Sequence, residues 1–566
     1  MLPSTLDIVL FLIIGGLIGL TGLLATKFTK KYSYIVEIIA AILAIGYTFY
    51  QYSFPDGFIY IGFISSGYFS LTVLSSGKEK YDEIKIELQT LQVEELELQK
   101  NPLRILLDFL IVAVVFSGAI LFYAYGPESP LKLLIIFGLV SAVTELIKRF
   151  FAYKSVKVFY SSPDESMYIV SPFAARKFPV SDLEQVHIES TVDVLKLHPL
   201  LTMFTSNLDF TTSFARVLRL SLPGETVFLT VTQPETWKEK FGIDQASDAN
   251  IIKVYPFYHK KNLKRLLGKL YFAVTVKGVS AYTGLLLLMY YLQIPIWLLV
   301  SITLIYWFLN LYFSDRVLKV AMDADETTDQ RVIAVSQRIF EKAGIRNVRV
   351  YETESTDYNG LATGMNIGRS MITLTTATLK LPVEAIEGII AHEAIHVKRR
   401  DVMWGQIWRF GFILVLLLVI WLIQKYIPTI EDYKIPLFML IWFLIVVFPI
   451  YQSYYSQWME VRADHLGASL LEGGSKQMAE SLTILANHQD AAVNKVVQYS
   501  TVAGNEEEEI SSLKRDSLIW RFIEFQFMAH PPMYWRVQTL QENVHGWGKV
   551  IWKRWFFDRI RESMTR

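Results

Sequence analysis

The sequence contains no cysteine among its 566 residues. Disulfide bonds, thiolate metal sites and cysteine nucleophiles are therefore excluded, and any metal ion must be held by histidine and carboxylate side chains. Histidine is also scarce, with nine residues in the chain. The formal net charge is only +1, which gives no sign of an electrostatic surface for DNA or RNA, so we expect no nucleic-acid partner.

Polar residues are too few for a water-soluble protein of this size. The chain is 52% hydrophobic and has a mean hydropathy of +0.32, which predicts membrane segments. A helix needs about 20 apolar residues to cross a bilayer. We predict a multi-pass α-helical membrane protein with about nine spans, although any single run alone would also suit a buried core helix. The runs cover roughly residues 6–25, 34–52, 57–76, 105–125, 131–150, 270–292, 294–313, 407–427 and 436–455.

Lysine and arginine in short loops mark the cytoplasmic side of a membrane protein. Basic residues gather in 26–33, 148–157, 259–269 and the carboxy-terminal tail, whereas 52–57 and 428–434 carry few or none. With nine spans the two kinds of loop alternate without conflict. We therefore expect the amino terminus outside, the carboxyl terminus inside and the soluble parts in the cytoplasm.

The apolar runs divide the chain into four parts. We expect an amino-terminal membrane domain of five spans at 1–154, a β-rich cytoplasmic domain at 155–258 and two further spans at 259–313. The last part, 314–566, is interrupted by a transmembrane hairpin at 407–455. Within the first part, residues 78–100 are highly charged with scattered leucines, and we expect a solvated amphipathic helix there.

The β-rich part alternates polar and apolar residues with period two. The segment "VLRLSLPGETVFLTV" predicts a hairpin around its PGE, and residues 234–242 predict a short closing helix. A run of strands closed by one helix resembles a pleckstrin-homology-like (PH-like) fold. Such a domain would contact a partner or lipid near the inner leaflet, or would act as a spacer. His187 and His198 within it are expected to be structural.

The segment "EGIIAHEAIHVKRRD", residues 387–401, contains the candidate metal-binding and catalytic residues. His392 and His396 stand four apart and so share one face of a helix. Glu393 follows the first histidine, which completes the HExxH pattern of two zinc-binding histidines and a general base. The alternative is a helix that exposes two histidines to solvent and binds no metal.

A catalytic zinc ion needs a third protein ligand and an open position for water. The position ten residues after His392 is Val402, which cannot serve. After the predicted hairpin the chain reads "WMEVRADHLGASLLE", where Glu460 is the first carboxylate. We assign Glu460 as the third ligand and Asp464, one turn later, as an acceptor that orients a ligating histidine. His465 is the rival ligand.

This order of motifs resembles the integral-membrane zinc metallopeptidases that include the HtpX heat-shock proteases and the CaaX prenyl endopeptidases. The segments "DYNGLATGMNIG" and "MAHPPMYWRV" agree with two further motifs of that family. The matching positions are Asn359, Ala362, Thr363, Gly364, His530, Pro531 and Arg536. Gly360 and Leu361 depart from the family's usual alanine and phenylalanine, which bears on the substrate pocket.

The resemblance implies an α+β domain of the gluzincin type that binds one Zn²⁺ ion, with Glu393 as general base. It implies an edge strand at Asn359, Gly360, Leu361 and Ala362 that binds a substrate peptide. It also implies that His530 stabilises the oxyanion and that Arg536 lies nearby. The plainer alternatives are an ordinary turn and strand for the first segment, and a proline turn with a structural ion pair for the second. Residues 328–345 and 348–353 predict the helix and strand that begin this domain.

We therefore expect an integral-membrane zinc endopeptidase that cleaves membrane proteins or peptides at the cytoplasmic face. Because the spacing of its motifs resembles that of the HtpX proteases, we expect the membrane to be the cell membrane, with an organelle membrane as the alternative. The rival is a catalytically silent membrane scaffold or binding protein that keeps the same fold. A transporter is a third possibility, but the predicted spans lack the paired buried charges that it would need. Glu37, Glu145 and Lys277 are the ionisable residues to examine there.

Overall fold

The computed structural model places most of the chain. It describes residues 4–25, 33–52, 54–75, 78–125, 131–189, 207–241, 295–322, 324–363, 370–426, 434–502, 509–542 and 546–565, with a few isolated positions between 260 and 267. The predicted run at 270–292, with Lys277, lies outside these ranges, as does His198.

Every predicted apolar run within the described residues coincides with one long helix. These helices are α1 (Thr5–Ala25), α2 (Ser33–Gln51), α3 (Phe54–Ser75), α5 (Pro102–Tyr125), α6 (Leu131–Ser155), α10 (Ile296–Ala321), α13 (Asp401–Tyr426) and α14 (Lys434–Ala468). By length and composition, two stretches of the described residues, Leu6–Ala25 and Tyr34–Gln51, are apolar enough to cross a membrane. The total of nine spans and their orientation stay a prediction.

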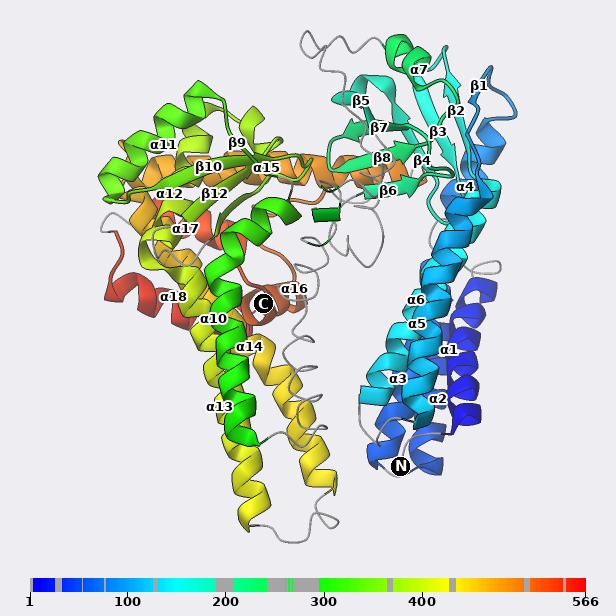
Figure 1. Cartoon of the computed structure of the whole chain (residues 1–566), viewed down its shortest axis with the longest axis horizontal. Helices are drawn as coiled ribbons and strands as arrows, with labels where there is room; N and C mark the ends of the chain where they lie inside the picture. The colour runs from blue at the N-terminus through cyan, green and yellow to red at the C-terminus, as the bar shows by residue number, and fades with distance from the viewer. Residues whose placement is uncertain are drawn as a thin grey trace.

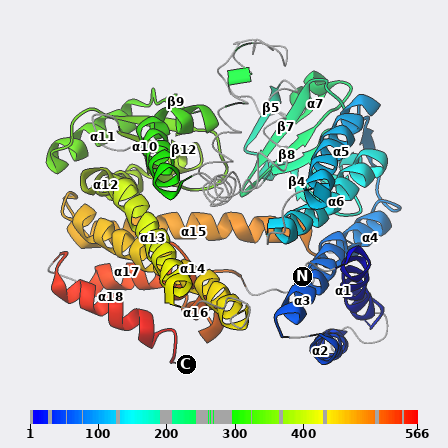
Figure 2. The same ribbon diagram turned by 60° about the horizontal axis from the view of Figure 1, so that its bottom comes forward.

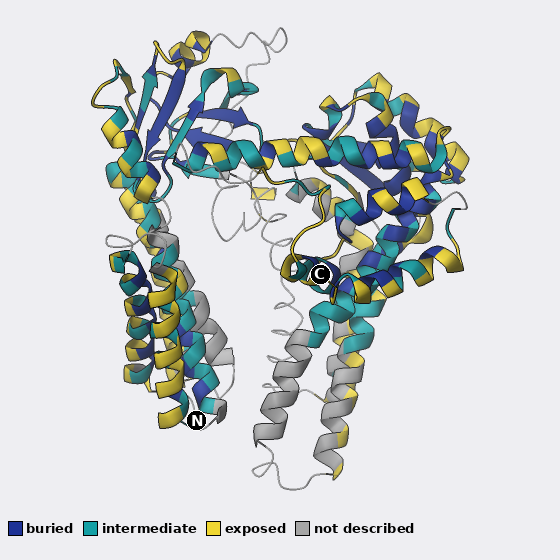
Figure 3. Ribbon diagram, turned by 180° about the vertical axis from the view of Figure 1, so that it is seen from behind, coloured by how far each residue is buried: buried dark blue, intermediate teal, exposed yellow. Residues whose placement is uncertain are grey.

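The long helices form two groups that extend to the same side of the molecule (Figure 1). One group contains α1, α2, α3, α5 and α6, and the other contains α10, α13 and α14. Figure 2, turned so that their lower ends come forward, shows both groups foreshortened. In the first group many outward-facing side chains are exposed and apolar, such as Ile42 and Leu43 of α2 (Figure 3).

The β-rich domain consists of two four-stranded sheets and one helix at the opposite end of the first group. The sheet orders are β1-β2-β3-β4 and β5-β7-β8-β6. The strands are β1 (Glu94–Leu96), β2 (Lys157–Ser161), β3 (Ser166–Val170), β4 (Arg176–Pro179), β5 (Gln185–Glu189), β6 (Asn207–Phe210), β7 (Val217–Leu222) and β8 (Glu225–Leu229), followed by α7 (Pro234–Lys240). The predicted hairpin is therefore present as β7 and β8, and the closing helix as α7. Trp237 of α7 packs into the core between the sheets.

The expectation of one amphipathic helix over 78–100 is wrong. The helix α4 (Lys78–Glu87) ends early, and β1 then pairs antiparallel with β2. Leu96 is buried in the β-rich core and Leu98 packs against it. These two leucines stand two apart, which suits a strand whose alternate side chains face one side. The scattered leucines were thus a strand pattern that follows a short helix.

The carboxy-terminal α+β domain is built around a mixed sheet of order β11-β12-β10-β9. Its strands are β9 (Asp325–Glu326), β10 (Val348–Thr353), β11 (Gly360–Thr363) and β12 (Ser370–Thr375). Its helices, besides α13 and α14, are α11 (Gln330–Ala343), α12 (Val383–Arg399), α15 (Gly474–Ser500), α16 (Leu518–Phe527), α17 (Met533–Glu542) and α18 (Lys549–Arg561). The predicted helix at 328–345 and strand at 348–353 are present as α11 and β10.

The 27-residue helix α15 belongs to both soluble domains. Near its start, Ser481 lies against Gly388 of α12 so closely that a Cβ atom at Gly388 would come within 2.3 Å of the serine oxygen. Near its end, Tyr499 is buried in the β-rich core and its hydroxyl donates to Asp182 at 2.8 Å. Figure 1 shows α15 running from one domain to the other.

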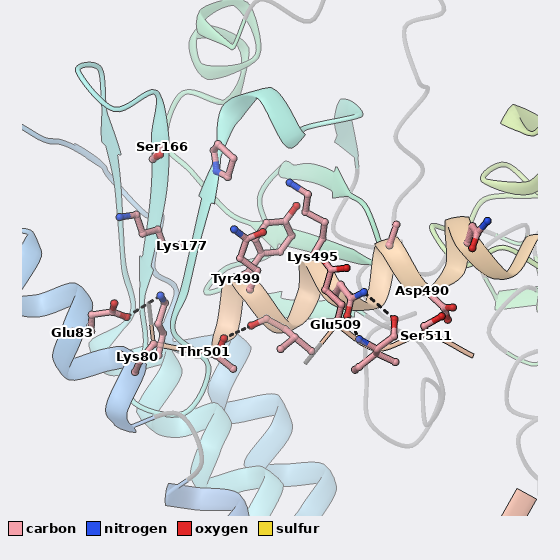
Figure 4. Close-up of a pocket in the computed structure, with 18 of the residues that line it drawn as sticks. Lys80, Glu83, Ser166, Lys177, Asp490, Lys495, Tyr499, Thr501, Glu509 and Ser511 are labelled. Carbon is pink, nitrogen blue, oxygen red and sulfur yellow. Dashed lines mark hydrogen bonds and ion pairs between the residues drawn. The ribbon is translucent and has the colours of Figure 1, made fainter. Parts of the chain in front are cut away.

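A pocket of about 950 Å³ lies between α15 and the β-rich domain. Lysines and carboxylates line it, among them Lys80 and Glu83 of α4, which form an ion pair at 2.8 Å (Figure 4). Lys495 of α15 also lines it and pairs with Asp182 at 3.0 Å. None of the predicted metal ligands lines this pocket.

Candidate metal centre

Helix α12 carries the HExxH residues. It begins after Pro382, has no internal proline, and ends where Arg400 adopts the left-handed conformation with φ 57°. His392 and Glu393 are each 8% exposed, so the site lies inside the domain. The Nε2 atoms of His392 and His396 are 3.0 Å apart. The helix therefore directs both imidazoles to one point, as the spacing of four predicts.

Glu460 reaches the same point from α14, on the far side of the predicted membrane hairpin. Its Oε2 lies 3.3 Å from His392 Nε2, and its Oε1 lies 3.3 Å from His396 Nε2. Among the described residues, these three form a group whose ligand atoms all lie within 4.8 Å of one another. The prediction of Glu460, made from its place as the first carboxylate after the hairpin, thus agrees with the geometry.

Asp464 accepts a hydrogen bond from the ring nitrogen of His392 that faces away from the cluster. His392 Nδ1 donates to Asp464 Oδ1 at 2.8 Å, which leaves Nε2 with its lone pair toward the cluster. Arg536 of α17 donates to both oxygens of Asp464, at 2.8 and 2.7 Å. Burial alone would raise the pKa of Asp464, but the Arg536 guanidinium outweighs it and holds that pKa far below its usual range. Both predicted supporting residues therefore meet, in an ion pair that is almost fully buried.

Asp401 holds the second histidine in the same way, and the sequence reasoning did not identify it. His396 Nδ1 donates to Asp401 Oδ2 at 2.8 Å. Arg462 of α14 forms an ion pair with the same carboxylate, and its guanidinium lies over the Trp458 ring, 4.3 Å from the centroid. The signal in the sequence was an aspartate five residues after the second histidine, at the first position of α13.

His530 lies at the open side of the cluster. Its side chain is 63% exposed, and its Nδ1 is 2.9 Å from Glu460 Oε2. The chain reaches this position just after α16, where Gln457 of α14 donates to the carbonyl of Met528 at 3.0 Å. An exposed imidazole beside the ligand set is suitably placed to contact a substrate.

The predicted substrate strand is β11, at the edge of the sheet next to α12. It pairs with β12, and the described residues supply no strand on its other side. A Cβ atom at Gly360 would come within 2.8 Å of Ile389 Cγ2 and 3.4 Å of Glu393 Cγ. Glycine therefore lets β11 approach the helix at the turn that carries Glu393. Just before the strand, the backbone of Asn359 is fixed by Thr375 and Thr378.

The donor set fits a zinc ion. Two imidazoles and one carboxylate are a usual set for a catalytic zinc site, and both imidazoles have the carboxylate partners that zinc-binding histidines commonly show. The electrostatics agree. Burial opposes a positive charge on His392, yet its bonds to Asp464 and Glu460 outweigh burial and raise the pKa of the ring to about 9. The negative charge of these carboxylates would likewise stabilise a metal cation in place of the proton.

His465, the rival ligand, is not part of the group. It is 1% exposed on α14, and burial lowers the pKa of its ring.

The remaining predicted substrate-binding residues lie at or next to β11. Asn359 precedes this strand, which packs against α12, and Leu361 on the strand is partly exposed. The side chain of Ala362, although on the same strand, lies outside what the structure describes.

Comparison with known families covers the two soluble domains. Residues 157–245 match the Bacterial PH domain, and residues 326–544 match Peptidase family M48. A protease HtpX homolog of Pelotomaculum thermopropionicum is 34% identical over 101 residues, which is 17% of this chain and 36% of that protein. One from Burkholderia thailandensis is 33% identical over 100 residues, 17% of this chain and 35% of that protein. The chain thus spans about a third of the length of these relatives. Residues 326–544, which contain the cluster described above, are thus similar to Peptidase family M48 and to HtpX proteases, and residues 157–245 are similar to a bacterial PH domain.

Proposed function

We propose that this protein is an integral-membrane zinc endopeptidase that cleaves membrane proteins or peptides at the cytoplasmic face of the cell membrane. The observation that supports this most is the group of His392, His396 and Glu460. Each histidine in it is fixed by its own aspartate. These residues would hold one zinc ion, which when bound acts as a Lewis acid on the peptide carbonyl and acidifies water.

The chain's own residues then perform the proton transfers. Glu393, buried on the same helix, accepts a proton from the attacking water. The water oxygen bonds to the carbonyl carbon of the peptide, the C–N bond breaks, and Glu393 returns the proton to the leaving amine. His530, on the exposed side, donates a hydrogen bond to the carbonyl oxygen as negative charge develops there. The outer edge of β11 aligns the peptide by backbone hydrogen bonds.

The position of the cluster supports a substrate at the membrane. Helices α13 and α14 form the predicted hairpin, and they carry Asp401 and Glu460 at the ends that enter the soluble domain. A bond cleaved at this cluster would therefore lie close to where a substrate leaves the bilayer. The PH-like domain, which Figure 1 shows beside the α+β domain and at the opposite end of the molecule from the free ends of the long helices, would provide a contact for a partner or lipid.

The test is cleavage of casein by the purified full-length protein, with and without a chelator. Glu393→Gln should retain zinc by metal analysis and lose cleavage by a factor of about 10² or more. Glu384→Gln is the matched control, because Glu384 is exposed on the first turn of the same helix. A fully active Glu393→Gln variant would refute the assignment. Absence of chelator-sensitive cleavage in the wild type would instead favour a catalytically silent scaffold.

A further inference from the structure

Helix α18 has apolar side chains on two opposite faces. One face packs into the protein through Ile551 and Trp555. On the other face, Val550 is 77% exposed and Phe557 is 63% exposed. Ile560 continues this outer face at helical spacing and is 42% exposed, and Met564, just after the end of α18, is also exposed. A helix that is apolar on both sides needs a second apolar environment.

Helix α16 has the same property beside it. Phe525 is buried in the cluster that also contains Trp555 of α18, so the two helices share one small core. On its outer side, Ile519 is 71% exposed and Trp520 is 57% exposed. Together α16 and α18 present aromatic and aliphatic side chains that no described residue covers.

Hydrogen bonds attach both α16 and α18 to the same stretch of α14, around Ser453 and Gln457. Ser453 donates to the carbonyl of Gln526 at the end of α16, at 2.7 Å, and accepts from Arg559 of α18 at 2.8 Å. Gln457 bonds to both helices as well, through the carbonyl of Glu524 and the guanidinium of Arg559. The sequence of α14 is apolar as far as Ile450 and becomes polar from Gln452 onward. The two helices are therefore attached where the apolar part of α14 ends.

Their orientation agrees with this level. In Figure 1, α18 runs crosswise to α13 and α14 at the lower edge of the peptidase domain, the side from which those long helices emerge. Figure 2, which brings that side forward, shows α16 and α18 next to α14, and both helices contact it. The exposed residues of α18 include Lys549 and Lys553, so basic groups accompany the apolar ones.

We propose that α16 and α18 form an in-plane membrane anchor, which inserts Trp520, Val550 and Phe557 into the interface of an anionic bilayer. Aromatic residues favour this depth, and lysines extend from it toward anionic headgroups. The proposal rests on the membrane location in the proposed function. It also implies a fixed distance between the membrane surface and the candidate metal centre. Glu460 lies seven residues beyond Ser453 on α14, which is roughly 10 Å at the helical rise.

The absence of cysteine makes a direct test possible, because an introduced cysteine is unique in the chain. Val550→Cys and Phe557→Cys variants of the full-length protein would each carry a nitroxide label in vesicles of phosphatidylcholine and phosphatidylglycerol. Collisions with oxygen report a lipid environment, and collisions with a water-soluble nickel chelate report solvent. Val493→Cys is the matched control, an exposed valine on α15.

We expect oxygen collisions to dominate at 550 and 557 and nickel collisions to dominate at 493. Nickel collisions that are as frequent at 550 and 557 as at 493 would overturn the proposal. So would dipolar broadening between labels that disappears on dilution with unlabelled protein, because a second copy would then cover this face. A label at Leu418, exposed on α13, separates the two failures: if it also reports solvent, the membrane location itself is wrong.

Discussion

Asp401 Oδ2 lies 2.8 Å from His396 Nδ1, although the two residues belong to different helices. The chain reverses between them through Arg400, whose positive φ ends α12 and starts α13. The second histidine is therefore oriented by the first residue of the helix that is predicted to enter the membrane. The position of that helix and the geometry of the metal centre are directly connected.

Asp401→Ala should lower zinc affinity by about 10- to 100-fold, because His396 loses the carboxylate that fixes its ring and tautomer. The measurement is a zinc titration of the metal-free protein against a competing chelator. Asp325→Ala is the control, since Asp325 is an exposed aspartate on β9. Equal affinities for the two variants would show that Asp401 does not orient the ligand.

Arg536→Gln should destabilise the α+β domain by about 3 kcal/mol, because it leaves the Asp464 carboxylate buried without its cation. The free energy of unfolding by denaturant, measured on the detergent-solubilised protein, gives this value. The exposed pair of Arg349 and Glu326 offers a comparison, and Arg349→Gln should cost less than about 1 kcal/mol. If both variants lose a similar free energy of unfolding, the buried pair of Arg536 and Asp464 stabilises the domain no more than an exposed pair does.

Gly360→Ala should reduce cleavage and stability, because its Cβ would lie 2.8 Å from Ile389 Cγ2 and push β11 away from α12. Overpacking of this kind costs about 1 to 3 kcal/mol. Adding Ile389→Ala removes the clashing methyl group, so the double variant should recover part of the lost cleavage rate. If the double variant is worse than the sum of the two single changes, close approach of the strand is not the cause.

Glu524 on α16 should make stability fall as pH rises. Burial, together with the charge of Asp516, raises the pKa of Glu524 from 4.5 to about 7 in the folded protein. Between these values the folded state binds more protons than the unfolded state, so unfolding becomes easier with increasing pH. Glu524→Gln should flatten this dependence of the melting temperature, and an unchanged slope would contradict it.

The sequence was sufficient for features that depend on local spacing. The HExxH residues meet because a spacing of four is fixed by the helix itself, and β7 and β8 follow from alternation around Gly224. The prediction of Glu460 required only that a hairpin return to its starting face. The same reasoning predicted one helix over 78–100, although α4 ends at Glu87. Within this charged segment the spacing of the apolar residues changes from that of a helix to the spacing of two seen at Leu96 and Leu98, which is typical of a strand.

Contacts set by the path of the chain could not be predicted. Asp401 reaches His396 only because a non-glycine residue adopts the left-handed conformation between them. The packing of α15 into two cores could not be predicted either. Apolar periodicity shows that a helix has a buried face, but it does not show which neighbouring element covers each part of that face. Tyr499 is buried by strands that lie some 270 residues or more before it in the chain.

Helix α15, with 27 residues, is roughly 40 Å long at the helical rise. Its start lies against Gly388, one turn before His392, and its end is embedded in the PH domain through Tyr499. A rod held at both ends does not let its two attachments shift independently. A displacement of the PH-like domain relative to the α+β domain would therefore have to bend α15 or tilt α12, the helix that carries His392.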